Sequence, residues 1–132
     1  MLGHIGLNVP DLEIAQEYYA DLMPRLGFES FLDDTDQFAF MPAGGKRGTF
    51  IFFYPANSPH PYSRETTTGL QHLAFMLPTR SAVDDLRTWA QSRGCAIVEE
   101  PREFPEYPPP YYATFWLDPF GLMLEAVCHY QT

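Results

Sequence analysis

Positive charge is scarce in this 132-residue chain, which has one Lys and seven Arg against 17 acidic residues and a net charge of −9. No basic stripe is available to neutralise phosphates, so we expect no nucleic-acid partner. Long apolar runs are also missing. The longest, residues 50–56, is far too short to cross a bilayer core of about 30 Å. We therefore expect no membrane partner.

Cysteine is equally rare. Cys95 and Cys128 have no CxxC spacing, which favours two reduced, buried thiols in a cytosolic protein over a disulfide framework or a redox motif. The N-terminus has no basic region followed by an apolar segment, so no signal peptide is predicted and a cytoplasmic location is expected. With 45% hydrophobic residues, the chain is long enough to bury one core.

The chain contains an internal repeat. Residues 4–10 read HIGLNVP and residues 72–78 read HLAFMLP, so both read His, apolar, small, apolar, any, apolar, Pro. A helix-like segment and then a Gly follow each copy, at Gly27 in the first and Gly94 in the second. This self-similarity predicts a duplicated module whose two histidines meet at the centre.

Apolar periodicity and turn residues predict the same order of elements in both halves, strand, helix and three strands. Strands are expected at 2–9, 28–32, 37–41, 49–54, 70–77, 95–99, 111–117 and 122–129, and helices at 11–23 and from Thr79 or Ser81 to Gly94. The Pro-rich segment 101–110 is expected to be a long loop that forms a lid or a rim. We predict a single α+β domain of tandem βαβββ modules, forming a curved mixed sheet around a central cleft. Module one would span 1–56, the connection 57–68 and module two 69–132.

Strand alternation places His4 and His72 on the faces that carry small residues, open enough to line a cleft. Glu125 lies among apolar residues of the last strand, and a buried carboxylate is costly unless it is paired, hydrogen-bonded or bound to a metal. Two imidazoles and one carboxylate suit a mid-to-late first-row divalent ion. We predict that His4, His72 and Glu125 bind one divalent metal ion (Fe, Mn, Ni, Co or Zn). The alternative is a metal-free protein that keeps these residues as a hydrogen-bond network.

The repeat also predicts what the site lacks. Aligning Gly48 with Gly121 places Phe52 at the position equivalent to Glu125. A symmetric site would have a second carboxylate there, so we expect three protein ligands beside an apolar wall.

Further candidates come from residues near these positions. Glu125, His129, Tyr111 and Tyr112 are candidate catalytic groups, because a carboxylate or imidazole can move a proton and a tyrosine can donate to a developing oxyanion. The candidate substrate-binding residues lie on the predicted cleft faces, the last strands and the Pro-rich loop: Asn8, Phe52, Tyr54, Met76, Arg102 and Trp116. For the aromatic residues the alternative is a place in the core, and for His129 an exposed place at a strand end.

Three stretches resemble the vicinal oxygen chelate superfamily, which includes glyoxalases, bleomycin-resistance proteins and extradiol dioxygenases. They are HIGL with PDL at 4–12, GLQHLAF at 69–75 and DPFGLMLE at 118–125. The resemblance covers nearly the whole chain. It implies paired modules around a metal that is chelated by two substrate oxygens, a role that would fall to His4, His72 and Glu125.

Two departures from the family pattern bear on function. The closing turn usually reads Asp-Pro-Asp-Gly, and Phe120 replaces its second acid. Glyoxalase I-like members generally carry a carboxylate where this chain has Phe52. The remaining ligand set is similar to that of extradiol dioxygenases or fosfomycin-resistance proteins, but the latter would need more cations than this chain has.

The sequence supports two hypotheses about function. One is a metal-dependent dioxygenase or lyase/isomerase that binds a small apolar or aromatic substrate through two adjacent oxygens. The other is a bleomycin-resistance-like protein that sequesters an aromatic ligand without catalysis. A homodimer is possible in either case, because related proteins often dimerise and a complete cleft could form within one chain or across two.

Overall fold

A computed structural model describes residues 1–58, 60 and 62–132. It divides the chain into two compact units, Met1–Pro61 and Tyr62–Thr132, and the division lies within the predicted connection 57–68. Residues 59 and 61 of that connection lie outside the described residues. Each unit is described by itself below.

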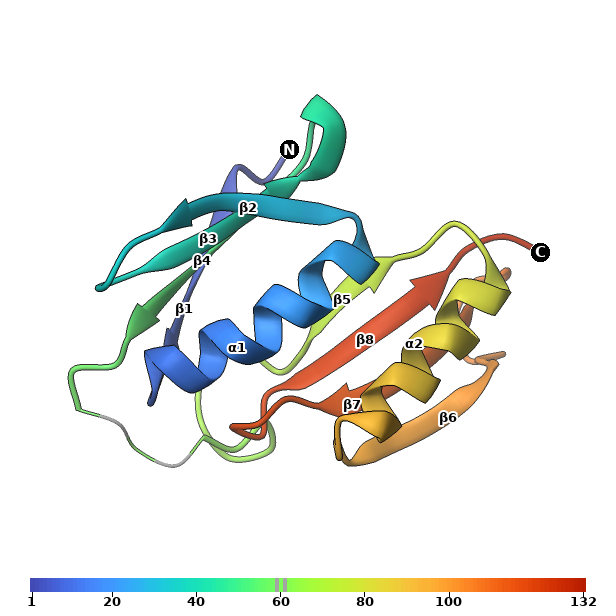
Figure 1. Ribbon diagram of the computed structural model, residues 1–132. Helices are drawn as coiled ribbons and strands as arrows, with labels where there is room; N and C mark the ends of the chain where they lie inside the picture. The colour runs from blue at the N-terminus through green and yellow to red at the C-terminus, as the bar shows by residue number, and fades with distance from the viewer. Residues whose placement is uncertain (59, 61) are drawn as a thin grey trace. The chain divides into compact units, whose positions relative to one another are not determined.

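The first unit begins with a strand and a helix and continues with three strands (Figure 1). Asp11 is the predicted N-cap of the helix, and its carboxylate accepts from Ile14 N at 3.0 Å. The chain leaves the following turn at Gly27, whose φ of 89° favours glycine. The elements are β1 (His4–Val9), α1 (Leu12–Leu22), η1 (Met23–Leu26), β2 (Phe28–Asp33), β3 (Phe38–Pro42), η2 (Ala43–Gly45) and β4 (Phe50–Pro55).

The sheet of the first unit has the order β1-β4-β3-β2, with β1 parallel to β4 and the other pairs antiparallel. Helix α1 packs on one face of this sheet, where the ring of Tyr19 lies 4.4 Å from that of Phe53. In the β1–β4 register Gly6 pairs with Phe52. Side chains alternate along each strand, so His4 and Phe52 share the other face.

The second unit repeats this order (Figure 1). Thr79 is the N-cap of its helix, and its hydroxyl accepts from Ala82 N at 3.1 Å. The turn before the last strand is closed by Asp118, whose Oδ1 accepts from Phe120 N and Leu122 N at 2.8 and 2.9 Å. The elements are β5 (Leu73–Met76), α2 (Arg80–Ser92), β6 (Ile97–Glu103), β7 (Tyr112–Leu117) and β8 (Met123–Cys128).

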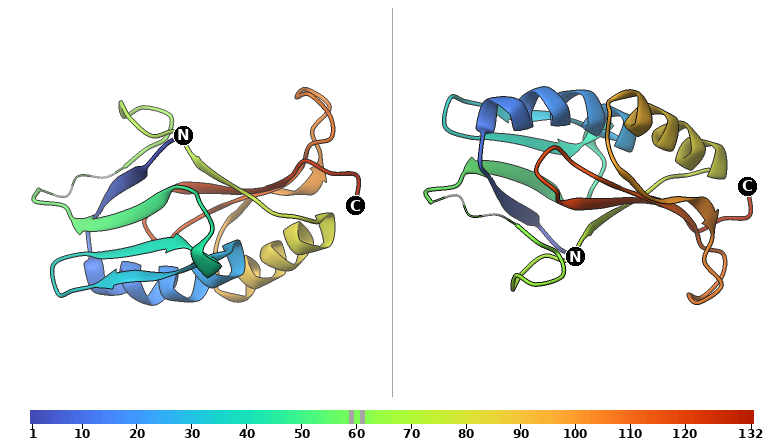
Figure 2. Two further views of the ribbon diagram at one scale, coloured as in Figure 1. Left: turned by 90° about the horizontal axis from the view of Figure 1, so that it is seen from above. Right: turned by 90° about the horizontal axis from the view of Figure 1, so that it is seen from below.

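The second sheet has the order β5-β8-β7-β6, with β5 parallel to β8 and antiparallel pairing elsewhere. Figure 2 shows helix α2 along one side of this sheet. All six residues of β8 are buried, and the strand is paired on both edges, with β5 and with β7. The opposite face from α2 carries Glu125.

The predicted α+β fold of two βαβββ modules is confirmed: the modules form two mixed four-stranded sheets, each with one helix. The predicted end of the strand at residue 99 is wrong, because β6 continues to Glu103 through Pro101. Proline is tolerated there because β6 is an edge strand and its pairing with β7 is irregular between Glu99 and Arg102. The Pro-rich loop is correspondingly shorter.

The two α-helices are short. Helix α1 has 11 residues and α2 has 13. Among the residues that the structure describes, no helix is long and apolar enough to cross a membrane.

Candidate functional site

The central feature of the second unit is a contact between His72 and Glu125. In the parallel pairing of β5 with β8, Ala74 lies opposite Glu125. His72 precedes Ala74 by two residues and so projects from the same face. Its Nε2 lies 3.0 Å from Glu125 Oε1. The Glu125 side chain is 1% exposed and that of His72 is 35% exposed, so the carboxylate is buried and the imidazole reaches the surface.

The second oxygen of the same carboxylate has its own partner. The hydroxyl of Tyr111 donates to Glu125 Oε2 at 2.6 Å. Burial of the phenol, followed by this hydrogen bond to Glu125, raises the pKa of Tyr111 well above its ordinary value. Tyr111 therefore keeps its proton at neutral pH. Because both oxygens of Glu125 have partners, the buried carboxylate is not left unsatisfied.

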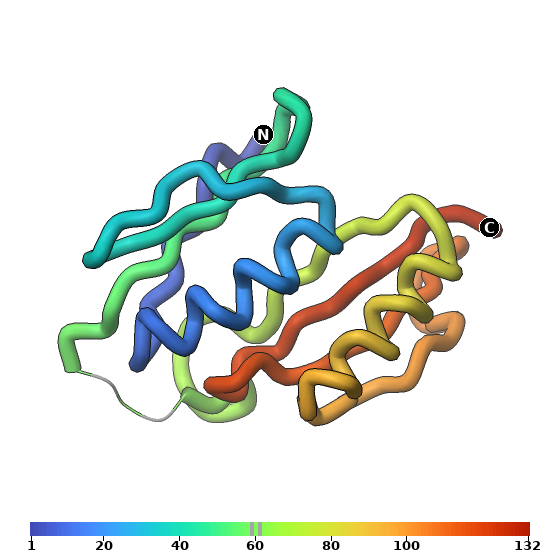
Figure 3. The backbone as a smooth tube through the Cα atoms, viewed as in Figure 1, coloured from blue at the N-terminus to red at the C-terminus, as the bar shows by residue number. Residues whose placement is uncertain are grey.

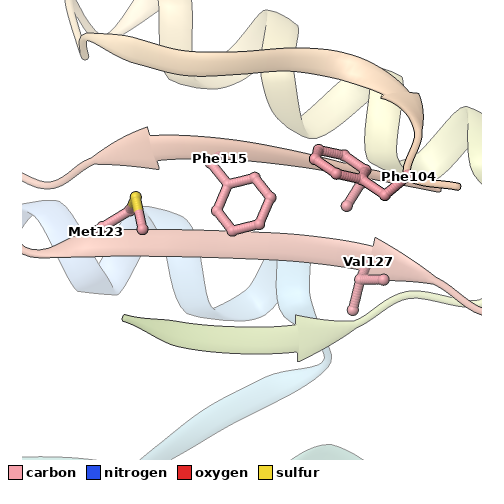
Figure 4. Packing of buried hydrophobic residues seen from close by; sticks show 5 residues of the cluster. Phe104, Phe115, Met123 and Val127 are labelled. Carbon is pink, nitrogen blue, oxygen red and sulfur yellow. The ribbon is translucent and has the colours of Figure 1, made fainter. Parts of the chain in front are cut away.

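An apolar cluster surrounds the carboxylate on this face of the sheet. Its buried members lie along β7 and β8 and at the end of β6: Phe104, Ala113, Phe115, Met123 and Val127 (Figure 4). The Phe115 ring lies 5.7 Å from that of His72 and 5.6 Å from that of Phe104. Apolar walls keep water away from the carboxylate, which strengthens each charge interaction inside the cluster.

The equivalent position in the first unit holds an aromatic side chain. Gly6 pairs with Phe52 as Ala74 pairs with Glu125, so the predicted equivalence of positions 52 and 125 is confirmed. The ring of His4 meets that of Phe52 edge to face at 5.3 Å. A histidine thus faces a carboxylate in one module and a phenyl ring in the other.

Further aromatic residues extend this face of the first unit. Phe31 lies 5.0 Å from Phe50 and 6.1 Å from Phe52 between ring centroids, and Phe52 stacks on Tyr54 at 6.3 Å. Phe31 is 50% exposed and Tyr54 is 37% exposed. The face without a helix is therefore aromatic and partly open to solvent.

The geometry of the pair is compatible with a metal ion. The distance of 3.0 Å from His72 Nε2 to Glu125 Oε1 is that of an ordinary hydrogen bond, and it places an imidazole nitrogen and a carboxylate oxygen side by side. Imidazole and carboxylate together suit a first-row divalent ion. Within residues 1–58, 60 and 62–132, no group of three His, Cys, Asp or Glu side chains is assembled for a metal. The second unit thus brings together one imidazole and one carboxylate.

Two of the sequence-predicted residues lie on the other face of the second sheet. Tyr112 pairs with Cys128, and its hydroxyl donates to Asp84 of α2 at 2.7 Å. Trp116 pairs with Leu124 and is fully buried. Both side chains lie on the helix-facing side of the sheet, so the structure does not bring Tyr112, a candidate catalytic residue, or Trp116, a candidate substrate-binding residue, to the face of Glu125.

The remaining predicted residues of the second unit lie on the Glu125 face or near it. Met76 is 74% exposed. Arg102 pairs with Ala113, and its guanidinium lies 3.8 Å over the Phe104 ring. His129 is exposed, its ring lies 5.1 Å from that of Tyr111, and its Nδ1 lies 3.3 Å from Pro110 O. His129 therefore contacts Tyr111 and does not contact Glu125 directly.

The predicted residues of the first unit share one face of its sheet. Asn8 pairs with Tyr54, as Gly6 pairs with Phe52. Asn8 is exposed like His4. These positions agree with the alternation that the sequence indicated.

Sequence reasoning missed several residues around the pair. Phe104 and Phe115 form its apolar walls, and Gln71 contacts the other ring nitrogen of His72. The sequence does not show which of the neighbouring aromatic residues face Glu125, because that depends on the register of β7. For Gln71, the sequence offers one indication of a role, which is its position directly before His72 of the repeat.

The raised pKa of Tyr111 predicts a pH-dependent contribution to stability. The contribution is complete below the ordinary tyrosine pKa of 10.0 and is lost as the pH rises toward the folded-state value. The destabilisation caused by Tyr111→Phe, measured by urea unfolding, should therefore be constant from pH 7 to about 9 and shrink above about 10.

The control for this measurement uses Glu125→Gln. Glu125 accounts for part of the raised pKa of Tyr111. The decrease in the Tyr111→Phe destabilisation at high pH should therefore be smaller when the protein also carries Glu125→Gln. A Tyr111→Phe effect that does not depend on pH up to 10.5 would contradict the assignment.

Comparisons with known proteins identify the family of the chain. The family model described as "Glyoxalase/Bleomycin resistance protein/Dioxygenase superfamily" matches residues 1–126. The uncharacterised protein PA2024 of Pseudomonas aeruginosa is 32% identical over 125 residues, which cover 94% of this chain and 85% of that protein.

Two solved structures show the same fold. One, from Bacillus halodurans, carries a provisional glyoxalase name; it is 30% identical, with a TM-score of 0.82 over 97% of this chain and 95% of that one. The other is a lactoylglutathione lyase of Agrobacterium tumefaciens, 20% identical, with a TM-score of 0.65 over 97% and 92% of the two chains. The chain therefore belongs to the glyoxalase/bleomycin resistance protein/dioxygenase superfamily.

Proposed function

We propose that this protein is a divalent-metal-dependent enzyme of the glyoxalase or extradiol-dioxygenase type. Its substrate is a small apolar or aromatic molecule that binds the metal through two adjacent oxygens. The observation that carries the proposal is the His72–Glu125 contact at 3.0 Å within an apolar cluster. A buried carboxylate next to an imidazole is costly to maintain, and such pairs concentrate at functional sites.

The proposed ligands are His72 and Glu125 together with His4. Support for His4 comes from its position in the repeat. His4 precedes Gly6 by two residues, and Gly6 pairs with Phe52. His72 likewise precedes Ala74 by two residues, and Ala74 pairs with Glu125. Two arrangements fit this proposal: His4 comes from the same chain, or it comes from the second copy of a homodimer. The proposed metal is Fe, Mn, Ni, Co or Zn, and when bound it acts as a Lewis acid toward the two substrate oxygens.

The chain's own residues have distinct proposed roles around that centre. Tyr111 holds a proton on its hydroxyl and fixes Oε2 of Glu125, which leaves Oε1 beside His72. Glu125 and Tyr111 are the groups placed to accept and donate a proton, and His129 supports the ring of Tyr111. Phe115 and Phe104 exclude water from the carboxylate.

The substrate would meet mainly apolar and aromatic surfaces. Proposed contacts are Phe52, Tyr54 and Asn8 of the first unit and Met76 and Arg102 of the second. In the first unit, the position equivalent to Glu125 holds Phe52, whose ring contacts His4. Proton transfer would therefore fall to groups of the second unit. We propose that the enzyme is cytoplasmic and acts on a small apolar or aromatic molecule.

A second candidate function is sequestration of an aromatic ligand without catalysis. The observation that favours it is the open aromatic face of the first unit, with Phe31 and Tyr54 exposed. With a net charge of −9, such a face would suit a flat aromatic cation.

Metal content distinguishes the two functions. Protein purified without chelators and analysed by mass spectrometry for the five candidate metals should hold about one ion per chain. His72→Ala, Glu125→Gln and His4→Ala should each lose most of it, because each removes one of three ligands. His60→Ala is the matched control, since it removes a histidine from the connection between the units, and it should retain the metal.

A metal-free protein would give the opposite result. If the wild-type protein contains no metal, binds none of the five on addition and still binds a flat aromatic cation such as proflavine, the enzyme proposal is wrong. Sequestration would then be the function.

Phe52→Glu tests the equivalence of the two modules. Position 52 has the same place in the first sheet as position 125 has in the second. The substitution therefore adds a carboxylate next to His4, as Glu125 lies next to His72. We expect zinc affinity to rise by at least about tenfold, because a fourth ligand is added. Phe31→Glu is the control, since it adds the same charge to the same face from β2. An equal effect of both variants would mean that only the added charge matters.

A further inference from the structure

The described chain that precedes β5 makes several hydrogen bonds of its own, and Figure 3 traces its path. Residues 62–71, here called the entry segment, lead directly to His72. The segment is folded on itself, because Thr67 N donates to Ser63 O at 3.0 Å and Glu65 N donates to Ser63 Oγ at 3.3 Å. Its later part turns at Gly69, whose φ of 134° strains any other residue. These contacts give the segment a defined path.

Tyr62 fixes the end of the entry segment. Its hydroxyl donates to Leu70 O and also lies 3.5 Å from Gln71 O. Burial of the phenol raises the pKa of Tyr62, so the hydroxyl keeps the proton that it donates. The backbone is therefore held at the two residues immediately before His72.

Gln71 continues this support to the imidazole ring. Its Oε1 contacts His72 Nδ1, while Nε2 of the same ring lies 3.0 Å from Glu125 Oε1. Both ring nitrogens thus face oxygen atoms, and a rotation of the ring would break both contacts. Histidine that binds a metal through one nitrogen usually donates its other N–H to an oxygen acceptor, which fixes the orientation of the ring.

We propose that Tyr62 and Gln71 are positioning residues for His72. Tyr62 holds the backbone of the entry segment, and Gln71 accepts the Nδ1–H of His72, so that Nε2 is the nitrogen directed to the space shared with Glu125. The importance of this arrangement for metal binding rests on the proposed function. The orientation of the His72 ring by Gln71 is independent of the proposed function.

The first test uses the metal-free protein. With the ring protonated on both nitrogens, ¹H–¹⁵N NMR should show a slowly exchanging Nδ1–H of His72 in the wild type, because Gln71 accepts its proton. Exchange should be at least about tenfold faster in Gln71→Leu, in keeping with the loss of one hydrogen bond. Gln71→Glu keeps an acceptor oxygen and should restore slow exchange. Tyr62→Phe should also accelerate exchange.

The second test measures zinc binding by calorimetry with the same variants. Gln71→Leu should weaken binding by about 10- to 100-fold, the usual effect of removing such an acceptor, and Gln71→Glu should restore it. Tyr62→Phe should act in the same direction. Gln131→Leu and Tyr130→Phe alter exposed side chains of the same types and should leave both readouts unchanged.

The two tests separate the two proposals. If the wild type binds no zinc, the proposed function fails, and the NMR exchange rates still decide whether Gln71 orients the ring. If Nδ1–H exchanges equally fast in wild type and Gln71→Leu, the positioning role is overturned whether or not zinc binds. Faster exchange in Gln71→Leu with unchanged zinc affinity would confirm that Gln71 orients the ring and would overturn the importance of that orientation for metal binding.

Discussion

The structure of the second unit depends on one constraint, the burial of the Glu125 carboxylate in the central region of its sheet. The side chain is 1% exposed, and a carboxylate in such surroundings must have partners for both oxygens. His72 and Tyr111 supply them at 3.0 and 2.6 Å. The parallel pairing of β5 with β8 positions the imidazole of His72. Tyr111 directly precedes β7, and the pairing of β7 with β8 positions its phenol. Apolar side chains complete the surroundings.

The duplication explains both the similarity and the difference between the modules. Both pair their first and last strands in parallel and in the same register, so each histidine faces the residue at one fixed position. In the second unit that residue is Glu125, and the contact is polar. In the first it is Phe52, and the contact is aromatic. One backbone arrangement thus yields a polar pair in one module and an apolar wall in the other.

Much of this was predictable from the sequence. The repeated HIGL and HLAF segments indicated the two βαβββ modules, and the glycine alignment identified Phe52 as the counterpart of Glu125. What the sequence did not supply was the register of β7. Tyr111, Tyr112, Phe115 and Trp116 all lie in one strand region, and only the pairing of Phe115 with Glu125 shows which of them share its face. The contacts of Tyr62 and Gln71 depend on the path of the entry segment, which has no periodic pattern to reveal it.

The central claim is that histidines from both modules and Glu125 bind one divalent ion. Pulsed electron paramagnetic resonance of the Mn²⁺- or Cu²⁺-loaded protein, with ¹⁵N-labelled histidine, tests it most directly. The account predicts hyperfine couplings from two imidazole nitrogens, one lost in His4→Ala and the other in His72→Ala. Bound metal without histidine couplings, or two couplings that both remain in His4→Ala or in His72→Ala, would contradict it.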